Sequence, residues 1–133
     1  MAIILDADVI IRGEKGTFGL QDWVAAQPDE QFEVAAITVA ELWHGVERAT
    51  GTHRTKRQRY LQTILASLPI IPYGEQTAYE HARIWAELES SGNMTGYYDI
   101  IVAATALEHG SKVATFNSRH FAHIKGLKII EPK

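Results

Sequence analysis

Four side chains in this sequence are of types that can perform catalysis, and each lies where one predicted element ends or the next begins. Asp6 ends the first apolar run of the chain, Glu41 lies just past the second, and Asn117 lies just past a later one. Asp99 opens a helix-like stretch. Oxygen-rich clusters of this kind bind divalent cations, so the residue types favour metal-assisted chemistry.

These residues can meet only if the fold brings their elements to a common edge. In an open parallel sheet with crossover helices, strand C-termini and helix N-termini share one edge, and ligands bind there. Strand-like and helix-like segments alternate along the chain, which predicts an α/β fold, a three-layer α/β/α sandwich with a mainly parallel sheet of about five strands. The predicted strands are 2–5, 32–37, 68–72, 112–116 and 127–130, and the predicted helices are 8–12, 20–27, 38–49, 53–67, 75–89, 97–109 and 119–124.

Local patterns refine two of these elements. Pro69 and Pro72 cannot donate hydrogen bonds to a sheet ladder, so the strand 68–72 is expected at an edge. The helix 75–89 repeats apolar residues at helical spacing, which predicts that they share one face of the helix: Ala78, Ala82, Trp85 and Leu88.

Each acidic residue also has a structural interpretation. Asp6 can cap the helix that follows it. Thr38 and Glu41 have the spacing of a capping box, and from this motif alone the cap is favoured for Glu41. Asp99 can be a first-turn acid that the helix dipole favours. The expected meeting of all three at one sheet edge, and the apolar helix that follows Asp99, support the functional interpretation.

Length and composition limit the class of protein. The 133 residues are expected to form a single domain, 1–133. The absence of cysteine excludes disulfides and thiolate chemistry, and the histidine spacing does not favour zinc. The N-terminus lacks signal-peptide features and no run approaches the length of a membrane span, so we expect a cytoplasmic protein without membrane contact.

The net charge of −3 argues against a general nucleic-acid coat, but it conceals a basic segment. Residues 53–59 carry four fixed positive charges in seven positions, which could bind the phosphates of a polyanion. The alternative is a solvated helix face, which is the more common explanation of an isolated basic run.

Four segments together resemble the PIN-domain ribonucleases, specifically the VapC toxins of bacterial toxin–antitoxin pairs. They occur in the family's order and nearly span the chain. The matching segments are Leu5-Asp6-Ala7-Asp8-Val9-Ile10, Thr38-Val39-Ala40-Glu41-Leu42-Trp43-His44-Gly45, Tyr98-Asp99-Ile100-Ile101-Val102-Ala103-Ala104-Thr105-Ala106-Leu107 and Ala114-Thr115-Phe116-Asn117-Ser118-Arg119-His120-Phe121.

The resemblance implies Mg²⁺- or Mn²⁺-dependent cleavage of RNA, inhibition by a cognate antitoxin protein and frequent homodimerisation. The family's acidic residues correspond to Asp6, Glu41 and Asp99. The chain departs from the family pattern at Asp8, where Ser or Asn is frequent, and in the last motif. That motif often offers an acid, whereas this chain has Asn117 and His120.

The working hypothesis is that Asp6 and Asp99 hold Mg²⁺ directly or through its waters and that Glu41 completes the shell or orients the attacking water. Asn117 is expected to position a water or the scissile phosphate. One rival is an aspartyl-phosphate-type phosphatase, which the absence of a clear strand-end lysine weakens. Another is a non-catalytic PIN-fold binding or scaffold protein, against which the retention of all three acids argues.

Overall fold

The computed structural model describes residues 2–133, so the expected domain boundary at Met1 lies outside the described residues. Its centre is a parallel sheet of five strands in the order β3-β2-β1-β4-β5. The strands are β1 (Ala2–Leu5), β2 (Gln31–Ala35), β3 (Ile70–Ile71), β4 (Lys112–Ala114) and β5 (Ile129–Ile130).

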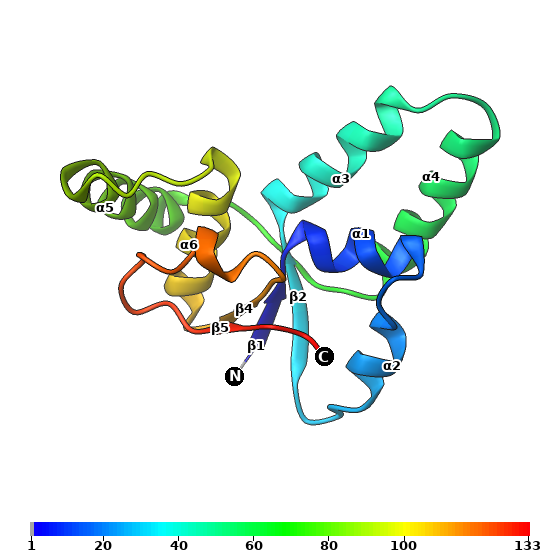
Figure 1. Ribbon diagram of the computed structural model, residues 1–133, viewed down its shortest axis with the longest axis horizontal. Coiled ribbons are helices and arrows are strands. Elements are labelled where there is room, and N and C mark those ends of the chain that lie inside the picture. Colours follow the sequence, from blue (N-terminus) through cyan, green and yellow to red (C-terminus); the bar gives the residue numbers. More distant parts are fainter. Residues whose placement is uncertain (1) are drawn as a thin grey trace.

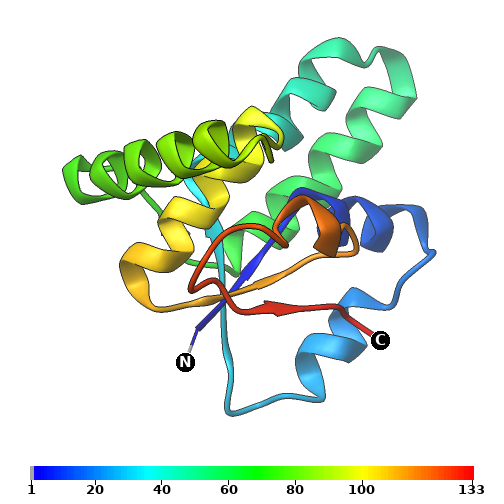
Figure 2. The same ribbon diagram turned by 60° about the vertical axis from the view of Figure 1, so that its left-hand side comes forward.

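Helices cover both faces of this sheet (Figures 1 and 2). Helices α3 and α4 form a hairpin that projects away from the sheet, whereas α5 and α6 pack together on the other side. The helices are α1 (Ala7–Lys15), α2 (Leu20–Ala25), α3 (Ala36–Arg48), α4 (Gly51–Ala66), α5 (Glu75–Ser91), α6 (Tyr97–His109) and the 3₁₀ helix η1 (Ser118–His120).

The central strand shows why the sequence folds into three layers. Successive side chains of a strand point to opposite faces. Ile3 and Leu5 of β1 therefore join the core under α1 to α4, whereas Ile4 joins the core under α5 and α6. All three are buried. An apolar run buried on both faces is the pattern of a central parallel strand, and the predicted α/β/α sandwich is confirmed.

Most predicted elements are present, with shifted boundaries. β3 lies at a sheet edge, as its flanking prolines predicted, but it pairs over only two residues. The predicted helix 97–109 has the observed bounds of α6, and Gly110 ends it with a positive φ of 66°. The predicted helix 119–124 is only the 3₁₀ turn η1.

Two local predictions are wrong. β2 runs directly into α3 at Ala36, so Thr38 lies inside the helix and the capping box with Glu41 does not form. The predicted apolar face of α5 is also wrong in part, because Trp85 is 45% exposed and Ala82 is exposed, whereas Leu88 is buried as predicted. The other buried residues of α5 are Thr77, His81 and Ile84.

Within residues 2–133, no helix is both long enough and apolar enough to cross a membrane.

Candidate active site

The residues that follow β1 and β4, the first two turns of α1 and α3 and the start of α6 surround one pocket of about 330 Å³. The order of the strands changes direction at the β1–β4 pair, which is where open α/β sheets bind ligands. The pocket is lined by Asp6, Ala7, Asp8, Ile11, Glu41, Gly96, Tyr97, Tyr98, Asp99, Asn117 and His120. The structure thus brings all four predicted site residues together, while their roles stay predictions.

Asp6 connects the central strand to α1. It is 5% exposed, and its Oδ1 accepts a hydrogen bond from the backbone N–H of Ala7 at 2.9 Å as the N-cap of α1. Its Oδ2 accepts a hydrogen bond from the hydroxyl of Thr115 at 2.8 Å. The capping function foreseen for Asp6 is therefore present, and it uses only part of the carboxylate's capacity to accept hydrogen bonds.

Glu41 reaches the pocket from the second turn of α3. Because α3 begins immediately after β2, its first turns lie at the carboxyl edge of the sheet and carry Glu41 to the acids that follow β1. Burial, followed by repulsion from Asp6, Asp99 and Asp8, raises the pKa of Glu41 to about 7. No hydrogen bond in the described part of the chain offsets these effects.

Burial also dominates at the other acids of the pocket. It is the largest cause that raises the pKa of Asp6 to about 6, and repulsion from Asp8 comes second. The pKa of Asp8 is raised, again mainly by burial. Loss of solvent therefore raises these pKa values more than repulsion between the clustered carboxylates does.

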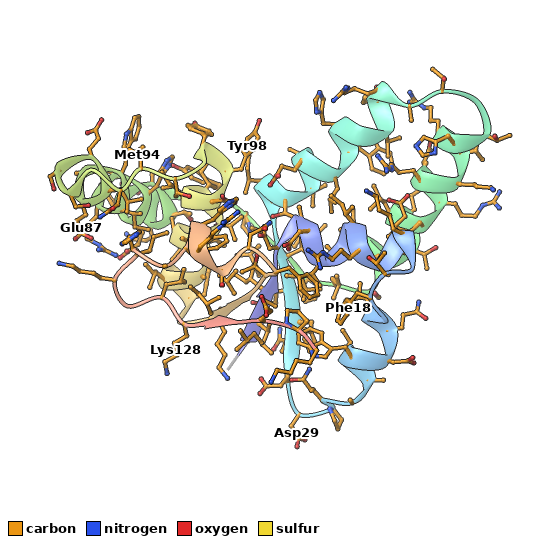
Figure 3. All side chains as sticks on the ribbon, in the orientation of Figure 1. Phe18, Asp29, Glu87, Met94, Tyr98 and Lys128 are labelled. Atoms are coloured by element: carbon orange, nitrogen blue, oxygen red, sulfur yellow. The ribbon has the colours of Figure 1, made fainter. Side chains whose placement is uncertain are left out.

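Asp99 lies in the first turn of α6 and has a partner in the pocket. Its Oδ2 is 3.2 Å from Nδ1 of His120, which belongs to η1. Burial raises the pKa of Asp99, and His120 partly offsets that effect. Figure 3 shows Tyr98 at this end of α6, close to the start of α3, so α6 forms one rim of the pocket.

Thr115 is the contributor that sequence reasoning missed. It is fully buried at the end of β4, where its hydroxyl donates to Asp6 and accepts from the backbone N–H of Asn117 at 3.0 Å. The amide Nδ2 of Asn117 donates to Oδ2 of Asp8 at 3.1 Å. A polar residue in an otherwise apolar strand end was the only available signal for Thr115.

The side chains of the pocket suit a hydrated oxygen-binding cation. Within residues 2–133, no three acidic or histidine side chains form a tightly grouped metal cluster. Mg²⁺ commonly takes only one or two carboxylates directly and keeps several waters, so it does not require such a cluster. Asp6, Glu41 and Asp99 offer oxygen ligands, and burial is the largest cause that raises the pKa of each. These residues fit Mg²⁺ or Mn²⁺.

The basic segment 53–59 lies on α4, away from the pocket. Two of its arginines have acidic neighbours: Arg54 pairs with Glu47 at 3.4 Å and Arg57 with Glu14 at 3.2 Å. The solvated-face interpretation therefore accounts for part of this charge. Arg119 lies closer to the acids, beside His120 on η1.

Comparisons with known proteins agree with this geometry. The model of the PIN domain family matches residues 3–127. Ribonuclease VapC1 of Rickettsia felis is 30% identical over 131 residues, which cover 98% of this chain and 96% of that protein. Among solved structures, VapBC2 from Rickettsia felis, bound to a promoter DNA fragment, matches with a TM-score of 0.92 at 20% identity over the full length of both chains.

A further solved structure belongs to the VapBC family of toxin-antitoxin systems. It is VapBC-5 from Mycobacterium tuberculosis, which matches with a TM-score of 0.75 at 26% identity and covers 99% of this chain and 98% of that chain. The family match spans nearly the whole chain, and the alignment with the Rickettsia felis ribonuclease covers nearly all of both proteins. The chain therefore belongs to the PIN domain family and, within it, to the VapC group.

Proposed function

We propose that this protein is a Mg²⁺-dependent endoribonuclease and the toxin component of a VapBC-type toxin–antitoxin pair. The observation that carries the proposal is the meeting of Asp6, Glu41 and Asp99 in one pocket at the switch point of the sheet. The names of the relatives, which are VapC ribonucleases and VapBC complexes, support the same reaction.

In the proposed reaction, Asp6 and Asp99 would hold the cation directly or through its waters, and Glu41 would add a further oxygen ligand or orient the attacking water. A bound divalent cation lowers the pKa of a water and neutralises charge that develops on the phosphate. Asn117 directs its amide toward the scissile phosphate or a water. Thr115 holds Asp6 in one orientation through its 2.8 Å hydrogen bond.

The phosphatase alternative needs a lysine for the phosphoryl group at the carboxyl edge of the sheet. The described residues that line the pocket include none, and Lys112 stands at the first position of β4, on the opposite edge. The scaffold alternative has less support. Removing three carboxylates from water in one pocket lowers stability, and a scaffold protein would gain nothing in return for that loss.

Labelled RNA incubated with the purified protein tests the proposal. We expect cleavage with Mg²⁺ that EDTA abolishes and that Asp6→Asn reduces by at least a hundredfold. Asp29→Asn is a matched control, because Asp29 is exposed and lies at the end of the molecule remote from Tyr98 (Figure 3). Hydrolysis of a small phosphomonoester without RNA fragments would indicate the phosphatase, and the absence of both reactions would indicate the scaffold.

We also propose an antitoxin and a second copy of the chain as partners. The solved VapBC structures support the antitoxin. The second copy is supported by apolar side chains that α5 and α6 expose, namely Trp85 at 45%, Tyr98 at 47% and Tyr97 at 61%. Light scattering of the wild type and of Trp85→Ser tests this point. A homodimer that the substitution weakens is expected, and a wild-type monomer at micromolar concentration would contradict it.

A further inference from the structure

Asp8 has a bonding pattern different from that of the other acids in the pocket. Its Oδ2 accepts hydrogen bonds from the backbone N–H of Phe116 at 2.9 Å and from Nδ2 of Asn117 at 3.1 Å. The hydroxyl of Thr115 lies 3.4 Å from Oδ2 and 3.5 Å from Oδ1. All of these donors belong to one segment, 115–117, which lies more than a hundred positions further along the chain.

The same segment contacts Asp6. The hydroxyl of Thr115 has one hydrogen, and the shorter distance of 2.8 Å assigns it to Oδ2 of Asp6. The backbone N–H of Asn117 donates to the hydroxyl oxygen of Thr115. Asp8, Asn117, Thr115 and Asp6 therefore form one connected network, in which a displacement of segment 115–117 would also release Asp6.

Asp8 and Asn117 are thus in direct contact. An acid at both positions would place two carboxylates at hydrogen-bond distance, which is strongly unfavourable. An acid opposite an amide gives a charge-assisted hydrogen bond, which is roughly twice as strong as a neutral one. The residue types at the two positions are therefore coupled.

We propose that Asp8 is a positioning residue that holds segment 115–117 in place, so that Asn117 faces the pocket and Thr115 orients Asp6. This inference rests on the proposed ribonuclease function, which it deepens by assigning Asp8 a role distinct from metal binding. Its negative charge matters because the segment directs two N–H donors at it, the backbone N–H of Phe116 and Nδ2 of Asn117.

Kinetics and metal response of Asp8→Ala separate this role from that of a ligand. We expect kcat for RNA to fall at least tenfold with KM within threefold. The Mg²⁺ concentration that gives half of the Tm increase should change less than threefold, and exchange of the Phe116 amide hydrogen should accelerate at least tenfold. Asp8→Asn, which keeps an acceptor for Phe116, should retain a higher kcat than Asp8→Ala.

Two results would overturn the proposal. A tenfold weaker Mg²⁺ response of Asp8→Ala would make Asp8 a ligand, and a lower Tm with unchanged kcat would make its role merely structural.

A double-mutant cycle tests the coupling directly. Asn117→Asp alone should lower both Tm and kcat by placing two carboxylates together. Combining it with Asp8→Asn should restore at least half of the lost Tm and raise kcat tenfold above that of Asn117→Asp. Additive effects would overturn the proposal. If the wild type cleaved no RNA, the proposed function would fail, whereas the Tm cycle and the Phe116 exchange would still decide the role of Asp8.

Discussion

At Asp6, helix capping and site chemistry share one carboxylate. Oδ1 caps α1 through Ala7, Oδ2 accepts from Thr115, and the residue also lines the pocket. Asp99 has fewer contacts, because His120 is its one hydrogen-bond partner in the side-chain contacts of residues 2–133. At Asp99, catalytic and structural roles therefore separate more cleanly than at Asp6.

Asp99→Asn keeps the size of the side chain but removes its charge. If Asp99 is a metal ligand, RNA cleavage should fall by orders of magnitude while the free energy of unfolding stays unchanged or rises, since burial and repulsion no longer oppose a charge. If Asp99 serves only the helix dipole, the substitution should cost about 0.3–1 kcal/mol and leave activity near normal.

Glu75→Gln is the matched control for this substitution, because Glu75 is an exposed first-turn acid of α5 outside the pocket. We expect it to lose a few tenths of a kcal/mol and to keep full activity. Urea unfolding and RNA cleavage are measured on both purified variants. An active Asp99→Asn protein with reduced stability would contradict the catalytic assignment.

The raised pKa values also predict how the metal-free protein responds to pH. Folding moves the pKa of Asp6 from 3.8 to about 6 and that of Glu41 from 4.5 to about 7. From pH 4 to pH 7 the folded state therefore binds more protons than the unfolded state, and the free energy of unfolding falls as the pH rises. For Asp6 the loss is on the order of 2–3 kcal/mol. Mg²⁺ should reverse it, with a Tm increase that is larger at pH 8 than at pH 5.

Unfolding in urea at pH 5 to 8, with EDTA or with Mg²⁺, checks this prediction. Burial lowers the pKa of His81, so the folded state binds fewer protons at this residue than the unfolded state does. The contribution of His81 to the free energy of unfolding therefore falls as the pH falls, which is opposite to the effect of the two acids. Glu41→Gln separates the two effects, since its pH dependence in EDTA should be flatter than that of the wild type. A wild type and a variant with identical slopes would refute the assignment to Glu41.

At the scale of elements, α4 supports α1, the helix that carries Asp8. The hydroxyl of Tyr60 donates to the backbone oxygen of Ile10 at 2.9 Å, and Arg57 of α4 pairs with Glu14 of α1. A half-buried hydrogen bond of this kind contributes about 1 kcal/mol. Tyr60→Phe should therefore lower the free energy of unfolding by that amount and leave kcat for RNA within twofold.

Tyr79→Phe is the control for this contact, because the hydroxyl of Tyr79 donates to Glu75 on the exposed face of its own helix. We expect a loss below 0.5 kcal/mol. Chemical denaturation and RNA cleavage are measured together. If Tyr60→Phe lost activity without losing stability, α4 would influence the reaction by a route other than packing.

The elements also show how far the sequence could predict the molecule. Apolar runs and helical spacing were sufficient for the layered parallel sheet, because a strand buried on both faces leaves a continuous apolar run in the sequence. The start of α3 could not be predicted, because Thr38 and Glu41 fit a capping box as well as a helix interior. In the structure α3 begins at Ala36, directly after β2, so both residues belong to the helix interior. The contacts of Thr115 and Asp8 depend on strand neighbours, which spacing along the chain does not encode.

At the scale of the whole molecule, the remaining question is where a polyanion would contact a protein of net charge −3. Arg54 and Arg57 have acidic partners, whereas Lys56 and Arg59 of the same helix form no ion pair within residues 2–133. Both are exposed. If RNA extends from the pocket along the α3–α4 hairpin, these two residues and the exposed Arg48 at the end of α3 are available to its phosphates.

Lys56→Ala combined with Arg59→Ala should then raise KM for RNA severalfold without changing kcat. The slope of log affinity against log salt concentration should fall by about 1.4, because each lost contact to a single strand accounts for roughly 0.7. Lys125→Ala with Lys128→Ala is the control, since both residues are exposed and Figure 3 shows Lys128 on the side of the molecule away from that hairpin. Equal changes in slope for the two pairs would mean that RNA responds to overall charge, and α4 would then present only a solvated basic face.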